Sequence, residues 1–426
     1  MTAPDQSPTV DEQRVTAIWR IESAKLIAVL ARLLRSVALA EEVAQDTFVE
    51  ALQRWRASGV PDNPGAWLMT AGRHRAYDVL RRARRAERGS EQLEREQPGA
   101  QRPRFDESLD DVVGDDLLRL IFVACHPLLS PESRVALTLR LLGGLTTDEI
   151  ARAFLVPEPT VAQRITRAKR TLGDAGVAFE LPQAPDLHAR LEAVLEVVYL
   201  IFNEGYLATA GDDWMRPGLC EDALRLGRIL AELMPEESEV HGLVALMEIQ
   251  ASRSHARTGA SGEAILLLDQ DRSKWDTLLV RRGLEGLARA EAVALTRPGP
   301  YLLQAAIAAC HARAGTASET DWPRSAALYA ALMLVAPSPI VELNRAVAAS
   351  MAFGPEAGLA IVEPLRADAA LSDYPFLPSV RADFLAKLGR FEEARSEVER
   401  AAALTKNARE RSLFLERAGA YGKGHA

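Results

Sequence analysis

Helical spacing of apolar residues runs through most of this sequence, and long strand-like alternation is absent. Ile27, Leu30 and Leu34 follow this spacing, and beyond Pro182 and Pro185 the chain is rich in Ala and Leu with the same period. Such a period places apolar side chains on one face of an α-helix. The 426 residues exceed the roughly 250 to 300 at which a single core stops growing. The sequence therefore predicts an all-α protein of several domains.

The composition is that of an ordinary globular protein, with 48% hydrophobic and 26% charged residues. No apolar run approaches the roughly 20 residues that span a bilayer, and the segment 1–10 lacks the basic and apolar blocks of a signal peptide. Three widely spaced cysteines cannot form a disulfide framework. We therefore expect a cytoplasmic protein.

The net charge of -8 is unevenly distributed. Residues 1–180 hold 25 basic and 26 acidic side chains, whereas residues 181–426 hold 26 and 33. Within the first part, the segment 73–88 contains seven arginines and two acids, and the segment 160–172 contains four basic residues and no acid. These two local positive faces are suited to contact phosphates.

Turn-forming and polar segments mark the boundary between the first two predicted domains. A turn-rich segment at 58–65 precedes a helix that Asn63 can cap. Polar residues with Pro, Gly and Gln fill 87–105, and 106–116 adds six acids and no base. The pattern predicts a helical domain over 10–86, a flexible acidic linker over 87–114 and a second small helical domain over 115–176.

The segment LTTDEIARAFLVPEPTVAQRITRAKRTL (145–172) has the pattern of a helix-turn-helix. Thr146 or Thr147 can cap its first helix, and Pro159 fits the first turn of its second. Val161, Ile165, Ala168 and Leu172 then recur at helical spacing, which buries one face. The polar side chains left on the other faces are suited to base edges and phosphates in the major groove: Thr160, Gln163, Arg164, Arg167 and Arg170. A basic face exposed only to solvent is the alternative.

The helix that follows Asn63 carries aromatic and cationic side chains together. Such groups can stack on unpaired bases while holding the phosphate backbone. A helix that ends in arginines also complements its own dipole, so this pattern alone leaves both interpretations open. The side chains concerned are Trp67, Arg73, His74, Arg75, Tyr77, Asp78, Arg81, Arg82, Arg84 and Arg85.

The C-terminal part carries a repeat signal. Two predicted helix ends, at Pro235 and Pro337, lie 102 residues apart, which is three times the 34-residue period of tetratricopeptide (TPR) hairpins. The segments 344–365 and 381–404 share a small-residue helix, a Gly turn and a second helix. We expect a TPR-like domain over 186–426, with an irregular helical bundle as the alternative.

Two segments, VALAEEVAQDTFVEALQRW (37–55) and NPGAWLMTAGRHRAYDVLRRARR (63–85), followed by the acidic linker and the helix-turn-helix, resemble regions 2 and 4 of extracytoplasmic-function (ECF) sigma factors of bacterial RNA polymerase. The resemblance covers about residues 10–175. The tail, with IFNEGY (201–206) and LLLDQDRSKWD (266–276), resembles the ECF subgroup that has a TPR-like C-terminal extension.

This resemblance implies roles for individual residues. It implies contact with the clamp helices of the largest polymerase subunit for Glu42, Gln45, Asp46, Thr47, Phe48, Leu52 and Trp55. It implies melting and reading of the -10 promoter element for Trp67, Arg73, His74, Arg75, Asp78, Arg81, Arg82 and Arg85. It implies reading of the -35 element for Thr160, Gln163, Arg164, Arg167 and Arg170. For the core-binding set, plain core packing is the alternative.

The sequence departs from the family at two places. Family members usually have asparagine where His74 stands. Their region 4 turn usually carries glycine or serine, whereas this chain has Val156-Pro157-Glu158-Pro159. The second departure leaves the start of the recognition helix undefined.

No motif for catalysis, phosphate binding or a calcium loop is present, so we expect no enzymatic activity and no cofactor. The pairs Cys125-His126 and Cys310-His311 are adjacent in helices and cannot chelate one metal jointly. Glu204, Asp212, Asp213 and Trp214 suit a ligand groove or, equally, helix capping and loop solvation.

The expected function is an ECF-type sigma factor whose helical tail regulates its activity, with core polymerase, promoter DNA and a small YCII-like protein as expected partners. Two alternatives stay open. One is a helix-turn-helix regulator with a TPR module that binds DNA without polymerase, and the other is a TPR-like scaffold for proteins.

Overall fold

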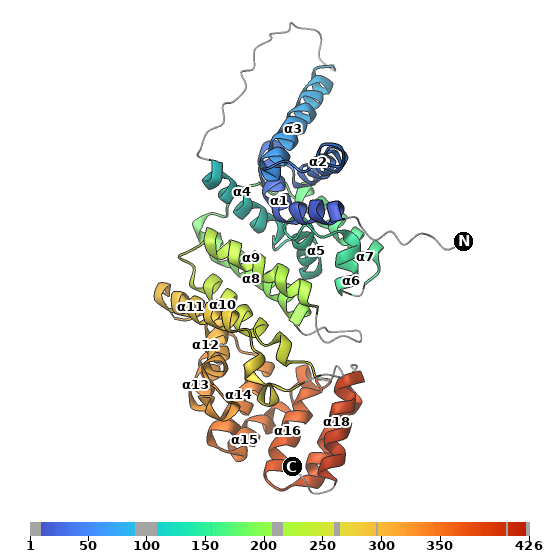
Figure 1. The fold of residues 1–426 in the computed structure, drawn as a ribbon. Coiled ribbons are helices and arrows are strands. Elements are labelled where there is room, and N and C mark those ends of the chain that lie inside the picture. The colour runs from blue at the N-terminus through green and yellow to red at the C-terminus, as the bar shows by residue number, and fades with distance from the viewer. Residues whose placement is uncertain are drawn as a thin grey trace, which may run out of the picture. The chain divides into compact units, whose positions relative to one another are not determined.

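A computed structural model of the chain describes residues 10–89, 109–154, 156–206, 216–259, 265–294, 297–405 and 408–422. Every secondary-structure element in these ranges is a helix, which confirms the predicted all-α class (Figure 1). The chain divides into two compact units, 1–200 and 201–426. Among the described residues, no helix is both long and apolar enough to cross a membrane.

The first unit contains the helices that the sequence assigned to its two N-terminal domains, together with the start of α8. Its helices are α1 (Val10–Leu34), α2 (Val37–Ser58), α3 (Pro64–Gly89), α4 (Leu109–Ala124), α5 (Pro131–Leu141), α6 (Thr147–Phe154), α7 (Glu158–Asp174) and α8 (Ala184–Tyr206), of which α8 continues into the second unit.

Helix α1 lies at the centre of this unit. It packs against α2, α3 and α4, and its residues from Leu26 to Ala31 are at most 1% exposed. A helix that is apolar on all sides must be covered on all sides. The helices that carry the predicted polymerase and -10 contacts, α2 and α3, are therefore held on α1.

The start of α3 follows the predicted capping. The backbone N–H of Ala66 donates to Asn63 Oδ1 at 3.0 Å, and Pro64 occupies the first helical position. This cap satisfies one of the free N–H groups at the helix start.

The helix-turn-helix is formed by α6 and α7, which pack on each other and on α5. Thr146 caps α6: its Oγ1 accepts from the N–H of Glu149 at 3.1 Å, and the Glu149 carboxylate accepts from the N–H of Thr146 at 2.8 Å. This reciprocal pair is a capping box. Helix α7 buries the four predicted positions, which are Val161, Ile165, Ala168 and Leu172.

Both ends of the expected linker differ from the prediction, because they are helical. Helix α3 continues to Gly89, and α4 begins at Leu109. Val113 and Leu117, four residues apart, lie on one face of α4, where Val113 is half-buried and Leu117 is buried. The many acidic residues around them led to the prediction of a linker in place of a helix. The rest of the expected linker, 90–108, lies outside the described residues.

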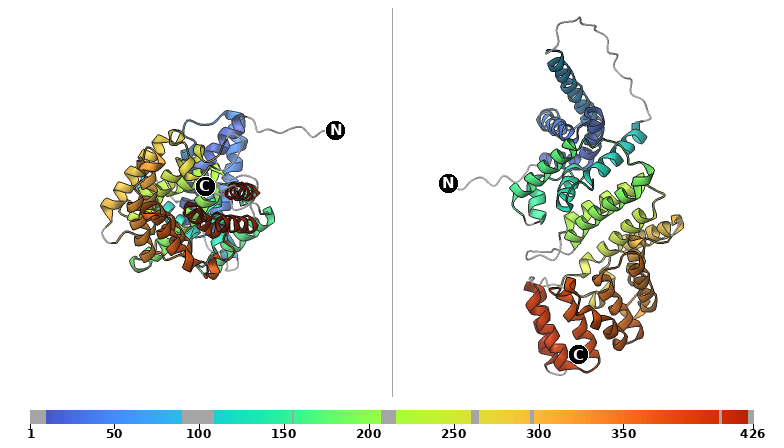
Figure 2. Two further views of the ribbon diagram at one scale, coloured as in Figure 1. Left: turned by 90° about the horizontal axis from the view of Figure 1, so that it is seen from below. Right: turned by 180° about the vertical axis from the view of Figure 1, so that it is seen from behind.

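The second unit consists of helices joined mostly by short turns, and Figure 2 gives two further views of them. Its α-helices are the end of α8, α9 (Pro217–Leu233), α10 (Ser238–Ala251), α11 (Thr277–Val293), α12 (Pro300–Arg313), α13 (Trp322–Val335), α14 (Pro339–Phe353), α15 (Pro355–Leu365), α16 (Phe376–Lys387), α17 (Phe391–Leu404) and α18 (Ala408–Tyr421). Short 3-10 helices lie at η1 (Ser254–Ala256), η2 (Leu267–Asp269), η3 (Arg272–Lys274), η4 (Ala317–Glu319) and η5 (Ala369–Leu371).

Consecutive helices of this unit pack on one another, and α10 contacts α9, α11 and α12. Small residues allow the close approaches: a Cβ atom added at Gly283 would lie 2.6 Å from Ile249 Cγ1, and one added at Gly358 would lie 2.6 Å from Ser350 Cβ. Such crossings agree with stacked helical hairpins. A TPR-like assignment of this unit stays a prediction.

Candidate nucleic-acid interface

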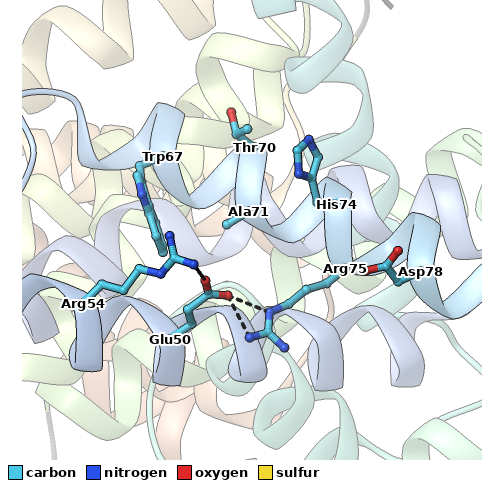
Figure 3. A pocket seen from close by; sticks show the side chains of 8 residues that line it. All are labelled: Glu50, Arg54, Trp67, Thr70, Ala71, His74, Arg75 and Asp78. Carbon is cyan, nitrogen blue, oxygen red and sulfur yellow. Dashed lines mark hydrogen bonds and ion pairs between the residues drawn. The ribbon is translucent and has the colours of Figure 1, made fainter. Parts of the chain in front are cut away.

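A cavity of about 430 Å³ opens between α2 and α3 of the first unit. The side chains from α3 that line it share one helix face, because they recur at three and four positions. Figure 3 shows Arg54 and Arg75 converging on the carboxylate of Glu50. The residues that line the cavity are Glu50, Arg54, Trp67, Thr70, Ala71, His74, Arg75 and Asp78.

Glu50 orients both arginines. Its Oε1 lies 2.8 Å from Arg54 Nη2, and its Oε2 accepts from Arg75 Nη2 at 2.8 Å and from Arg75 Nε at 3.1 Å. The paired contact with Arg75 fixes the plane of that guanidinium. Arg75 is half-buried, so it forms part of the cavity wall and is not a freely mobile surface cation.

Trp67 is held by a second aromatic ring. Trp55 packs edge-on against it with ring centroids 5.4 Å apart, and the Arg54 guanidinium lies 6.0 Å from the centroid of the Trp67 ring. Trp55 itself is buried. The Trp67 ring is thus pre-oriented at the cavity, which lowers the entropy cost of stacking on a planar group.

Beyond the cavity, α3 presents a row of arginines. Arg81, Arg82 and Arg85 are exposed, whereas Arg73 is half-buried. His74, which lines the cavity, is exposed as well. Asp78 forms an ion pair with Arg81, and this hydrogen bond lowers the pKa of the Asp78 carboxyl below its ordinary value. The helix surface therefore combines fixed positive charge with one ionised acid.

Helix α7 exposes most of the predicted -35 residues. Gln163, Arg167 and Arg170 are exposed, and Thr160 and Arg164 are half-buried. In the ranges that the structure describes, no ion pair involves Arg167 or Arg170. Their guanidinium groups therefore remain free to bind phosphate or base edges.

One basic residue of α7 is used differently. Lys169 forms an ion pair with Glu41 of α2, and Arg140 Nε of α5 donates to the same carboxylate at 2.7 Å. Gln45 also donates to Glu41, at 2.6 Å. Glu41 is 4% exposed, so the ion pairs join α2 to α5 and α7 in a largely dry environment.

The predicted core-binding residues divide between two environments. Glu42 and Asp46 are exposed, and Gln45 and Leu52 are half-buried. Phe48 stacks on Trp19 with ring centroids 4.5 Å apart. Thr47 is fully buried and donates to the carbonyl of Val43 at 2.7 Å, and Trp55 is buried as well. In this structure the last two contribute to packing, so the exposed acids are the groups available to a partner.

Sequence reasoning missed Glu50, Arg54 and Thr70 as cavity residues. The spacing of Glu50 and Arg54, four residues apart on a helix, was the available signal for their ion pair.

The described residues contain no group of three or more His, Cys, Asp or Glu that could hold a metal ion. Burial raises the pKa of the Cys125 thiol to about 11 and that of Cys220 to about 12.

Comparison with protein families matches three parts of the chain. Residues 20–86 match the family model described as sigma-70 region 2, and residues 119–172 match sigma-70 region 4. Residues 190–291 match a family of unknown function, DUF6596. The basic helices α3 and α7 thus lie in the two sigma regions, and the chain belongs to the sigma-70 family.

Two curated proteins are similar to this chain over different lengths. An uncharacterized protein, R00370 of Rhizobium meliloti (strain 1021), is 45% identical over 388 residues, which is 89% of each chain. A probable ECF RNA polymerase sigma factor, SigI of Mycobacterium tuberculosis, is 24% identical over 170 residues, 40% of this chain and 58% of that one. Within the sigma-70 family, the chain belongs with the ECF sigma factors. No solved structure matches it.

Proposed function

We propose that this chain directs core RNA polymerase to specific promoters and that α3 and α7 read the -10 and -35 elements. The observation that supports this most strongly is the coincidence of the two basic helices with sigma-70 regions 2 and 4. Sigma factors are not an enzyme class. The place of action expected for this chain is the cytoplasm, where its polymerase works.

At the -10 element, the cavity between α2 and α3 is proposed to receive an unpaired base of the opened strand. Trp67 offers a ring for stacking, and the arginines further along α3 offer charge for the phosphates. Stacking and cationic contact replace part of the base stacking that is lost on melting.

At the -35 element, α7 is proposed to enter the major groove of duplex DNA with Gln163 and Arg167 facing the base edges. Arg170 is exposed near the end of the helix, where a cation suits a phosphate. Two weak contacts made by one molecule reinforce each other, because the first raises the effective concentration of the second.

Core polymerase is proposed to bind the exposed part of α2, where Glu42 and Asp46 stand free of packing. The second unit is proposed to regulate this activity in place of a separate anti-sigma protein. No observation supports the expected YCII-like partner, and it is not part of the proposal.

The test uses holoenzyme formed from core polymerase and the full chain, with a promoter selected from a random library. Trp67→Ala is expected to weaken binding of the single-stranded -10 segment by about 1 to 3 kcal/mol, while Trp67→Tyr retains most of it because the tyrosine ring also stacks. If Trp67→Ala binds the single-stranded -10 segment as tightly as the wild type does, Trp67 does not make the proposed stacking contact. Binding of duplex operator by the chain alone would instead indicate a regulator that acts without polymerase.

A further inference from the structure

The second unit contains a cavity of about 470 Å³ that the sigma assignment does not use. Its lining residues come from the end of α8, the segments around η1 and η2, and helices α14, α16 and α18. Its apolar wall is formed chiefly by Leu266, Val347, Phe376, Val380, Phe384 and Phe414. A cavity of this size falls in the range of small-molecule sites.

Three arginines line the same cavity, and only one of them is neutralised. Arg417 lies 3.5 Å from the Asp383 carboxylate and donates to the hydroxyl of Tyr421 at 3.0 Å. Arg253 and Arg257 have no carboxylate partner in the part of the chain that the structure describes. The cavity therefore carries more positive than negative charge.

Arg253 and Arg257 are arranged around aromatic rings. The guanidinium of Arg257 lies 3.7 Å from the centroid of the Tyr206 ring, and its Nη1 donates to the Tyr206 carbonyl. Arg253 lies 5.7 Å from the Tyr206 ring and 5.9 Å from the Trp275 ring. These contacts hold the cations in place, but they do not neutralise them.

Two buried polar atoms at this cavity have no hydrogen-bond partner. They are Nε of Arg253, which can only donate, and the side-chain oxygen of Gln270, which can only accept. Unpaired buried polar atoms are uncommon in folded proteins, because desolvation is then left uncompensated. An incoming anion could pair with the Arg253 donor but not with the Gln270 oxygen, which needs a donor.

Neighbouring groups do not supply the missing negative charge. Burial lowers the pKa of Arg257, which reflects a charge kept away from both water and counterions. Burial, assisted by Arg253 and Arg272, lowers the pKa of His311 to about 4, so this imidazole is neutral at pH 7. The surroundings of Arg253 thus favour an incoming anion.

We infer that this cavity binds a small organic anion, with its carboxylate, phosphate or sulfonate on Arg253 and Arg257 and its apolar body against Val347, Val380 and Phe414. A guanidinium binds such groups through parallel hydrogen bonds. The inference concerns binding alone and stands whether or not the second unit regulates transcription.

The test compares two fluorescent probes on the full chain. 1-Anilinonaphthalene-8-sulfonate is an anion, and N-phenyl-1-naphthylamine is a neutral molecule of similar shape. Arg253→Gln is expected to weaken sulfonate binding about tenfold and to leave binding of the neutral probe within about twofold, because only the anion loses a charged partner. Arg253→Lys keeps the charge and is expected to restore most of the affinity.

Three controls decide whether the probe occupies this cavity. Arg282→Gln removes an exposed cation from α11, outside the cavity, and should change neither probe. Val347→Trp should fill the cavity and abolish binding of both. Decanoate should displace the sulfonate, whereas decanol should not. Sulfonate binding that survives Arg253→Gln or Val347→Trp undiminished would overturn the inference.

Discussion

Glu41 joins α2 to α5 and α7 through ion pairs. Its carboxylate meets Arg140 and Lys169, whose side chains are each 22% exposed, while its own is 5% exposed. Removing one member of a buried ion pair costs more than the pair itself contributes, since the remaining charges stay desolvated.

We expect Glu41→Gln to destabilise this packing by about 3 kcal/mol, because it leaves two partly buried cations without a counter-charge. Hydrogen–deuterium exchange of the amides in α5 and α7 measures the effect, which corresponds to roughly a hundredfold faster opening. Glu42→Gln is the matched control, since Glu42 is the exposed neighbour on the same helix. Similar exchange in the two variants would show that Glu41 does not hold these helices together.

His311 makes the second unit sensitive to acid. The imidazole is 8% exposed and packs edge-on against Trp322 with ring centroids 5.1 Å apart. Burial lowers its pKa from the ordinary value of 6.5 to about 4. Because the folded-state pKa lies below the unfolded-state value, the unfolded chain takes up the proton first. The stability is complete above pH 6.5 and is lost as the pH falls toward 4.

The wild-type chain should therefore lose about 2 kcal/mol of unfolding free energy more than His311→Gln when the pH falls from 7 to 5. Urea unfolding followed by tryptophan fluorescence measures the difference, because Trp322 touches this imidazole. His255→Gln removes an exposed histidine and should keep the wild-type pH dependence. An equal loss in the wild type and in His311→Gln would refute the assignment.

At the scale of single helices, the sequence correctly predicted the features that depend on residues close together in the chain. The Asn63 cap and the four buried positions of α7 follow from neighbours within a few residues, and the structure selects Thr146 from the two candidate caps of α6. The unusual turn before α7 proved compatible with this fold: the helix begins at Glu158, and Pro159 occupies the first turn, where a proline loses no intrahelical hydrogen bond.

Contacts between distant helices were beyond the reach of that reasoning. The pairing of Arg75 with Glu50 spans 25 residues, and that of Arg140 with Glu41 spans 99. Periodicity assigns a side chain to a helix face, but it does not say which distant helix that face meets. The sequence therefore identified the cationic residues of α3 and α7. It did not identify Glu50 and Glu41, which form ion pairs with Arg75 and Lys169.

For α7, we expect Arg167→Ala to weaken holoenzyme binding to a -35 element by about 1 to 3 kcal/mol, since a base or phosphate contact is lost. Arg152→Ala is the matched control, because Arg152 is exposed on the neighbouring α6 and already lies 2.6 Å from Asp148. Filter binding on promoters with and without the -35 element provides the measurement. A loss no greater than that of the control would assign α7 another surface for DNA.

At the scale of the whole molecule, the structure places the boundary between its compact units at residues 200 and 201, within α8. The sequence had suggested a domain start near 186, after two prolines that do mark the beginning of this helix. The first part of α8 belongs to the first unit: Arg190 donates to the Phe122 carbonyl at 2.9 Å, and Glu196 pairs with Arg134 at 3.0 Å. Composition cannot reveal which unit such a shared helix joins.

A truncation that ends at residue 200 tests whether the second unit regulates transcription, because it keeps these α8 contacts. We expect the truncated chain to initiate at a rate that differs at least several-fold from that of the full chain at equal core polymerase. A second truncation at 183 removes the α8 contacts as well and separates loss of regulation from loss of stability. Identical initiation by the full chain and the chain ending at 200 would exclude regulation by the second unit under these conditions.

The most direct test of the central claim is transcription in vitro with core polymerase on a library of random promoters. The purified full chain should produce defined start sites that share sequence at two places, near -10 and near -35. The double variant Arg164→Glu with Arg167→Glu should lose those start sites that depend on the -35 sequence. Initiation no higher than that of core polymerase alone would contradict the assignment of this chain as a sigma factor.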